Sequence, residues 1–92
     1  MPALNDRDID ARLAALSNWR RENDEIRKEF TFADFRASMA FVNRVADLAN
    51  AADHHPDIDI RYSRVLIALS THSEGGITDK DFALAQQIEA AT

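Results

Sequence analysis

The sequence predicts an α+β domain in which three helices pack on one face of a four-stranded antiparallel sheet, in the order helix, hairpin, helix, hairpin, helix. Three observations lead to this fold class. Two pairs of segments show the two-residue alternation of apolar and polar side chains that is typical of strands. A long segment between the pairs has the apolar spacing of a helix, and helix start signals stand near both ends of the chain. With 92 residues, we expect one domain over residues 1–92.

The first helix is expected to begin after Asn5, whose side chain can cap it. Asp6 and Asp8 then stand in the first turn, where the helix dipole favours acidic side chains. The helix would bury one stripe, made of Ile9, Leu13 and Leu16.

A hairpin is expected next, with strands at 19–22 and 25–32 on either side of the turn-forming pair Asn23-Asp24. In the second strand the apolar residues Ile26, Phe30 and Phe32 alternate with polar ones. Lys28 falls on the apolar side of this pattern. It either extends its ammonium group out of the core or marks an edge strand.

Residues 34–52 have the pattern of one long helix, with Asp34 or Thr31 as its cap. Its apolar residues form two stripes, one of Phe35, Met39, Val42, Ala46 and Ala49 and the other of Phe41, Val45 and Leu48. Two stripes are more than one sheet face usually covers. Either the helix is deeply buried, or one stripe meets another subunit. The helix must end before Pro56, because proline favours an extended conformation in the preceding residue.

The second hairpin is expected from the alternation in 58–62 and the apolar run 65–69. A turn through Ser63-Arg64 aligns three apolar pairs, namely Tyr62 with Val65, Ile60 with Ile67, and Ile58 with Leu69. This register makes Tyr62 a core residue and, when extended, sets His72 opposite His55. The turn lacks Asn-Gly or glycine, so a longer turn with a register shift of one or two residues is the alternative.

The last helix has a well-marked start. After the turn-like segment 73–76, Thr78 and Asp81 have the spacing of a capping box, with Ile77 and Phe82 placed as a hydrophobic staple. Its apolar side is formed by Leu84, Ala85 and Ile88.

Composition narrows the functional classes. The chain has no cysteine, so it has neither a disulfide framework nor a thiolate metal site, and we expect a reducing, cytoplasmic setting. Residues 1–6 show no targeting signal, and no segment approaches the ~20 apolar residues of a membrane span. A net charge of −5, with arginines scattered among carboxylates, argues against direct binding to nucleic acid. Phosphate-loop, dinucleotide-loop and nucleophile-elbow patterns are absent from the sequence.

The candidate chemistry lies in the histidines. All three, His54, His55 and His72, fall within nineteen residues, and the hairpin between them brings them to its open end. Histidine is the side chain that exchanges protons most readily near neutral pH, so three at one site suggest acid–base catalysis. In an extended segment, His54 and His55 point to opposite sides. They are then poor joint ligands for a metal, which leaves a metal site as a lesser alternative, but they can address different parts of one organic substrate.

Nearby polar residues have simpler explanations as well. A single histidine such as His54 could merely end a helix, where the dipole favours it. Asp53 could orient an imidazole or be a polar residue at the helix exit. On spacing alone, Asp81 has a structural role in the last helix.

The sequence resembles the pterin-4a-carbinolamine dehydratases, also called 4a-hydroxytetrahydrobiopterin dehydratases. The residues that carry the resemblance are Asp53-His54-His55-Pro56, Tyr62, Leu69-Ser70-Thr71-His72 and Asp81, together with Trp19, Phe30-Thr31-Phe32, Asp34-Phe35 and Arg44-Val45-Ala46 upstream. The similarity therefore covers nearly the whole chain. It implies the fold predicted above, assembled as dimers or tetramers.

The resemblance also implies a function. A member of this family removes water from 4a-hydroxytetrahydropterin and yields quinonoid dihydropterin, which recycles the pterin after aromatic amino-acid hydroxylation without a metal or organic cofactor. By this resemblance His54 and His72 have acid–base roles and His55 mainly holds the substrate. The resemblance assigns the remaining substrate-binding positions to Asp53, Ser70, Thr71 and Asp81.

One position departs from the family pattern. The family often has glutamate four residues before the first histidine, where this chain has Asn50. An amide supplies no negative charge, so any carboxylate role there is lost or passes to Asp53. The alternative function is a non-enzymatic interaction module, a dimerisation cofactor or regulator on the same fold, because animal members of the family also serve as dimerisation cofactors of a homeodomain transcription factor.

The small core predicts assembly. A chain of this length without disulfides has few ways to hide all its apolar surface, so we expect a homodimer or a homotetramer built as a dimer of dimers. Either the long helix or a sheet edge is expected at an interface, with Phe41 and Val45 as the first choices for residues that face the other subunit.

Overall fold

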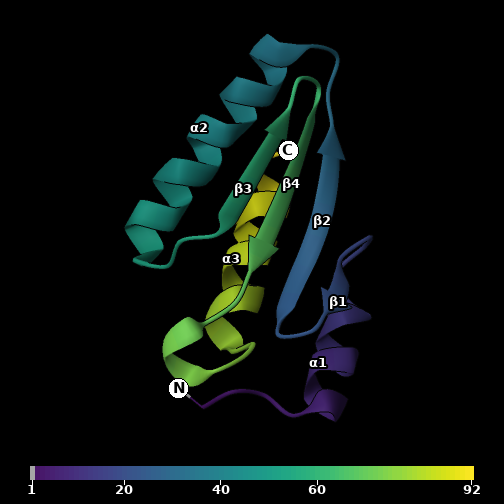
Figure 1. The fold of residues 1–92 in the computed structure, drawn as a ribbon, viewed down its shortest axis with the longest axis vertical. Coiled ribbons are helices and arrows are strands. Elements are labelled where there is room, and N and C mark those ends of the chain that lie inside the picture. The colour runs from purple at the N-terminus through teal and green to yellow at the C-terminus, as the bar shows by residue number, and fades with distance from the viewer. Residues whose placement is uncertain (1) are drawn as a thin grey trace.

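The computed structural model has a four-stranded antiparallel sheet in the order β1-β2-β4-β3, with helices packed against it (Figure 1). The structure describes residues 2–92. Met1, which belongs to the segment 1–6 that was predicted to hold no targeting signal, lies outside the described residues. The α-helices are α1 (Asp6–Leu13), α2 (Phe35–Ala52) and α3 (Asp79–Ala90), and the strands are β1 (Arg20–Glu22), β2 (Glu25–Thr31), β3 (Asp57–Arg61) and β4 (Arg64–Leu69). A short 3-10 helix, η1, spans His72–Glu74. The predicted α+β fold and element order are confirmed.

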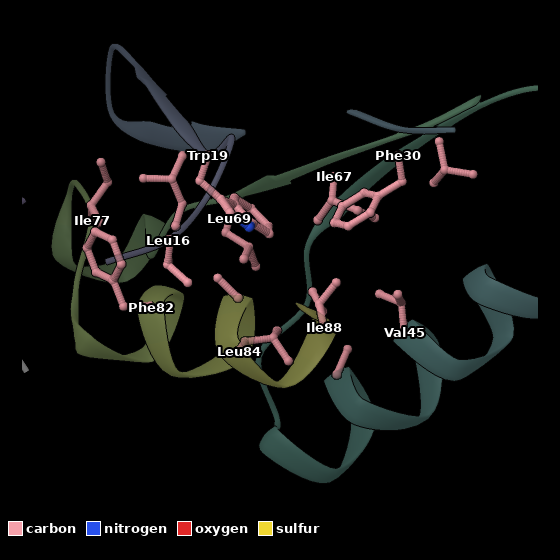
Figure 2. Close-up of a cluster of buried hydrophobic side chains, with 14 of the residues drawn as sticks. Leu16, Trp19, Phe30, Val45, Ile67, Leu69, Ile77, Phe82, Leu84 and Ile88 are labelled. Carbon is pink, nitrogen blue, oxygen red and sulfur yellow. The ribbon is translucent and has the colours of Figure 1, made fainter. Parts of the chain in front are cut away.

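The core lies between one face of the sheet and the helices. Figure 2 shows Phe30 and Ile67 of the sheet directed toward Leu84 and Ile88 of α3 and Val45 of α2. These side chains belong to one continuous apolar cluster that also includes Trp19 and Ile9. No helix within residues 2–92 is both long enough and apolar enough to cross a membrane.

The predicted helix starts are confirmed by their hydrogen bonds. The amide of Asp8 donates to the side-chain oxygen of Asn5 at 2.9 Å. Asp34, and not Thr31, caps α2, because its carboxylate accepts from the amide of Ala37 at 2.8 Å. Thr31 is instead the last residue of β2.

Lys28 lies on an inner strand, so the edge-strand explanation of its position is wrong. Strand β2 pairs with β1 on one side and β4 on the other. The Lys28 ammonium donates to the Ser17 carbonyl at 3.2 Å, forms an ion pair with Glu89, and lies 4.8 Å from the centre of the Phe30 ring. The other explanation holds, since the stem crosses apolar surface while the charged end finds partners at the margin of the core.

The β3–β4 register differs from the predicted one by two residues. Ile60 pairs with Val65 and Ile58 with Ile67, because the turn is made by residues 62 and 63. Tyr62 has a positive φ of 52° and is 67% exposed, so it is a turn residue and not the core partner of Val65. A shift of two residues leaves every side chain on the same face of the sheet, which is why the core residues of this hairpin were still identified.

The two stripes of α2 have different surroundings. Phe41 and Val45, which belong to one stripe, are fully buried within the subunit. The expectation that Phe41 and Val45 face another subunit is therefore wrong, because this stripe of the helix faces the core of its own subunit. On the other stripe, Phe35 is 48% exposed. Its ring stacks on that of Tyr62, with 6.3 Å between the ring centres.

Candidate functional site

The first two histidines follow directly from the end of α2. The helix ends at Asp53, which adopts the left-handed conformation with φ of 51°. The amide of Asp53 donates to the Asn50 carbonyl at 3.3 Å and that of His54 to the Ala49 carbonyl at 3.1 Å. This arrangement satisfies two of the carbonyls in the last turn of the helix and turns the chain before Pro56, which leads into β3. His54 and His55 are thus held in a short, tightly bonded connection.

His54 contacts a buried carboxylate from another part of the chain. Its Nε2 atom lies 2.5 Å from Oδ1 of Asp81, in the first turn of α3. The His54 side chain is 12% exposed, and the Asp81 side chain is fully buried. A carboxylate accepts hydrogen bonds, so in this pair the hydrogen lies on Nε2 and the remaining ring nitrogen, Nδ1, is the atom available for proton exchange.

The Asp81 carboxylate accepts hydrogen bonds from three donors, of which His54 is one. Besides His54 on Oδ1, the Thr71 hydroxyl donates to Oδ2 at 2.9 Å and the Thr78 amide donates to the same oxygen at 2.9 Å. The Thr71 and Thr78 hydroxyls are 2.8 Å apart. We call Asp81, Thr71 and Thr78 the buried cluster, because each is at most 4% exposed. A buried carboxylate needs such partners, and the cluster fixes its position beneath His54.

His55 has a different partner. Its Nε2 atom lies 3.0 Å from Oδ1 of Asn50, in the last turn of α2, and both residues are exposed. No sequence pattern indicated this pair, because the two residues are five positions apart and a helix does not bring such positions together. The left-handed conformation of Asp53 produces the contact, and an asparagine or aspartate at a helix end is the signal that could have suggested it.

His72 lies beyond the β3–β4 ladder, so it is not paired opposite His55. The ladder ends where Asp57 meets Ala68, and His72 begins η1. The Thr71 amide donates to the Gly76 carbonyl at 2.9 Å, which closes the η1 loop, and Gly75 occupies the left-handed region with φ of 72°. His72 is exposed and lines a cleft of about 370 Å³.

This cleft has an acidic wall that the sequence analysis did not identify. Its other lining residues are Ser70, Gly75 and Gly76 on one side and Glu22, Asn23, Asp24 and Glu25 of the β1–β2 turn on the other. Only the tertiary pairing of β2 with β4 places that turn beside His72, so no local pattern could have indicated it. Its volume is within the range of small-molecule sites.

The predicted site residues therefore fall into four groups, one of which is His55 with its partner Asn50. His54, Asp81 and Thr71 form one hydrogen-bonded chain, and Thr71 directly precedes His72 in the sequence. Ser70 and His72 line the cleft. Asp53 is exposed at the end of α2 and serves as its C-cap. Within residues 2–92, no cluster of three or more His, Asp or Glu side chains is arranged to hold a metal ion.

Comparison with known proteins gives a consistent family. A family model described as pterin 4 alpha carbinolamine dehydratase matches residues 2–91. A protein of Chloroflexus aurantiacus (strain J-10-fl) is 55% identical over 89 residues, which cover 97% of this chain and 96% of the other. One from Metallosphaera sedula is 51% identical over 89 residues, covering 97% and 93%. Both are provisionally named pterin-4-alpha-carbinolamine dehydratases.

Two solved structures share the fold. A Brucella melitensis protein described as a transcriptional coactivator/pterin dehydratase superposes with a TM-score of 0.93 at 33% identity, covering 97% of both chains. A pterin dehydratase-like protein, described as a RuBisCO assembly factor in the alpha-carboxysome, has a TM-score of 0.69 and 24% identity and covers 83% of this chain and 90% of its own. At that identity the second likeness concerns the fold alone.

Proposed function

The chain belongs to the pterin 4 alpha carbinolamine dehydratase family, and from this premise we propose that it removes water from a 4a-hydroxytetrahydropterin to give quinonoid dihydropterin. The observation that carries the proposal is the contact between His54 and the buried Asp81 carboxylate. An imidazole held on one nitrogen by a buried carboxylate is oriented for proton transfer through its other nitrogen.

The proposed reaction is an elimination. His54, in its protonated form, gives a proton to the 4a-hydroxyl as the C4a–O bond breaks, and water leaves. The N5–H proton passes to His72, and the electron pair of that bond forms the C4a=N5 double bond. One proton is supplied and one is taken up, so no oxidant or reductant is required. General acid–base catalysis of this kind typically contributes about 10²–10⁴-fold to a rate.

The other residues have supporting roles in this proposal. The Asp81 carboxylate faces the His54 imidazolium, which stabilises the charged acid. Thr71 and Thr78 hold that carboxylate in place. His55 is assigned to binding the pterin, and Ser70, which lines the cleft beside His72, contributes a further polar group. Asp53 supports the site through its left-handed backbone conformation, which ends α2 directly before the two histidines.

A direct assay tests the proposal. A hydroxylase reaction that releases 4a-hydroxytetrahydropterin gives an ultraviolet signal that decays slowly in buffer. Micromolar wild-type protein should accelerate the decay, and His54→Ala should lose most of that acceleration. Decay at the buffer rate with folded wild-type protein would rule out the dehydratase function. We further propose that the protein acts in the cytoplasm and supports an aromatic amino-acid hydroxylase, the reaction class that produces this substrate.

A second candidate is a non-enzymatic interaction module on the same fold. It is favoured by Asn50, which replaces the glutamate common at this position, and by the Brucella relative, which is described as a coactivator as well as a dehydratase. An inactive wild-type protein that still forms a stable complex with a partner chain would support this candidate.

We also propose that the protein forms a homodimer or homotetramer through the outer stripe of α2. The Phe35 and Tyr62 rings stack on each other although the two residues are 48% and 67% exposed, and Ile60, in the strand that leads to Tyr62, is 37% exposed. Burying this patch against a second copy would remove it from water.

Phe35→Glu should yield smaller species in light scattering with little loss of subunit stability. Phe41→Glu, the matched change on the inner stripe, should unfold the subunit, because Phe41 is fully buried. A wild-type mass of 10.3 kDa, that of one chain, at tens of micromolar would contradict assembly.

A further inference from the structure

We infer that Asn50 is a positioning residue that fixes the His55 ring with its hydrogen on Nε2, so that His55 can only accept a hydrogen bond from the pterin. This inference rests on the proposed function. It assigns a role to the position where the chain departs from the family pattern, and it rests on the 3.0 Å contact between Asn50 and His55.

The contact has one chemically sensible direction. The Asn50 atom that faces His55 is Oδ1, an amide oxygen, which accepts hydrogen bonds and donates none. The partner atom, Nε2 of His55, must therefore carry the hydrogen. In a neutral imidazole the other nitrogen, Nδ1, then bears a lone pair. Because Nε2 is occupied by Asn50, Nδ1 is the ring nitrogen left for a ligand.

The backbone holds the two side chains in this relation. Asn50 is in the last turn of α2, and its carbonyl accepts the amide of Asp53 at 3.3 Å. Asp53 then turns the chain through its left-handed conformation, and Pro56 restricts His55 to an extended one. The ring of His55 is thus presented to the helix end from a fixed direction, although both side chains are exposed.

Because Asn50 is neutral, the two histidines also differ in the charge of their partners. His54 faces the carboxylate of Asp81, with which it forms an ion pair when protonated, whereas His55 faces a neutral amide. The structure thus gives one imidazole a counter-ion and gives the other none. This suits His54 as the proton donor and His55 as a neutral acceptor.

The consequence for the substrate concerns its hydrogen-bonding groups. A lone pair on Nδ1 binds an N–H or O–H group and repels a bare carbonyl oxygen. Reduced pterins carry such donors at their ring nitrogens and at the 4a-hydroxyl. His55 should therefore favour pterins that present a hydrogen-bond donor to Nδ1. Moving the ring hydrogen from Nε2 to Nδ1 should weaken the binding of these pterins.

The tautomer can be measured without any activity. In protein labelled with ¹⁵N-histidine, the three imidazoles are few enough to assign by single replacements, with His55→Gln identifying the resonance of interest. At alkaline pH, where imidazoles are neutral, wild-type His55 should carry its hydrogen on Nε2 alone. Asn50→Lys supplies only donors and should place hydrogen on Nδ1, while Asn50→Asp keeps an acceptor and should preserve the wild-type pattern.

An unchanged His55 tautomer in Asn50→Lys would overturn the inference, and this result would not depend on whether the protein is a dehydratase. With substrate, Asn50→Lys should raise KM severalfold and change kcat much less, and Asn50→Asp should restore most of the binding. Reversal of the tautomer with an unchanged KM would overturn the assigned role in binding. If the wild-type protein has no dehydratase activity, the proposed function is wrong, but the tautomer measured by spectroscopy is unaffected.

Discussion

His54 and His55 are adjacent in the chain but lie in contrasting surroundings. His54 is 12% exposed above the buried cluster of Asp81, Thr71 and Thr78. His55 is exposed at the end of α2, where its partner is the amide of Asn50. Proline favours an extended conformation in the residue before it, and successive side chains of an extended segment point to opposite sides, which accounts for the different partners of two neighbours. The surroundings of each histidine are therefore set by the hydrogen-bond acceptor that it contacts and by the burial of that acceptor.

The strongest test of this contrast is His54→Ala. Removing the proposed proton donor should lower kcat about 10²–10⁴-fold, equivalent to roughly 3–5 kcal/mol, with a small change in KM. Single-turnover measurements on the 4a-hydroxy substrate would separate the two constants. A loss confined to KM would mean that His54 binds the substrate without exchanging its proton.

The next largest effect is expected from Asp81→Asn. An asparagine side chain at position 81 has one acceptor oxygen where the carboxylate has two. It therefore cannot accept from His54, the Thr71 hydroxyl and the Thr78 backbone amide together, and at least one buried donor would lose its acceptor. The free energy of unfolding should fall by about 2–3 kcal/mol, measured by urea titration. The kcat should also fall, because the His54 ring loses its counter-ion. Full activity in a folded variant would show that Asp81 is only a helix cap.

Thr71→Val tests the cluster without touching a histidine. Valine matches threonine in shape but removes the hydroxyl that donates to Asp81 and bonds to Thr78. Stability should fall by about 1–2 kcal/mol, because two buried groups each lose one partner. Ser73→Ala, in the same loop but exposed, is the control and should change stability by under ~0.5 kcal/mol. Equal losses in the two variants would contradict the importance of the cluster.

The smallest effect is expected from His55→Ala. Because His55 is exposed, thermal unfolding should hardly change, while KM should rise several-fold to about tenfold with kcat nearly preserved. A loss of kcat as large as that of His54→Ala would remove the distinction between the two histidines.

Local patterns predicted the elements well because the deciding interactions are local. The caps of α1, α2 and α3 each involve residues within three positions of one another, so Asn5, Asp34 and Thr78 could be identified from spacing. The β3–β4 register could not be fixed in the same way. It depended on Tyr62 accepting a positive φ of 52°, which is unfavourable for a bulky residue and is not indicated by any preference of tyrosine.

The positions of some candidate residues were predicted for the same reason. The long helix was expected to end before Pro56, which places His54 and His55 at its end, and the capping box placed Asp81 at the start of α3. The contact of Asp81 with His54 was not predictable from either signal, because it requires α3 to lie against the end of α2. The acidic wall beside His72 likewise depends on the pairing of β2 with β4, whose residues are some forty positions apart.

The two histidines lie between backbone positions that have little freedom. Asp53 occupies the left-handed region, which costs a non-glycine residue about 1–2 kcal/mol, and Pro56 has a fixed φ and restricts the residue before it. The conformational entropy of this short segment is therefore lost when the chain folds and not when a ligand arrives. Binding then requires little further ordering of the imidazoles, so a larger share of the contact energy remains as affinity.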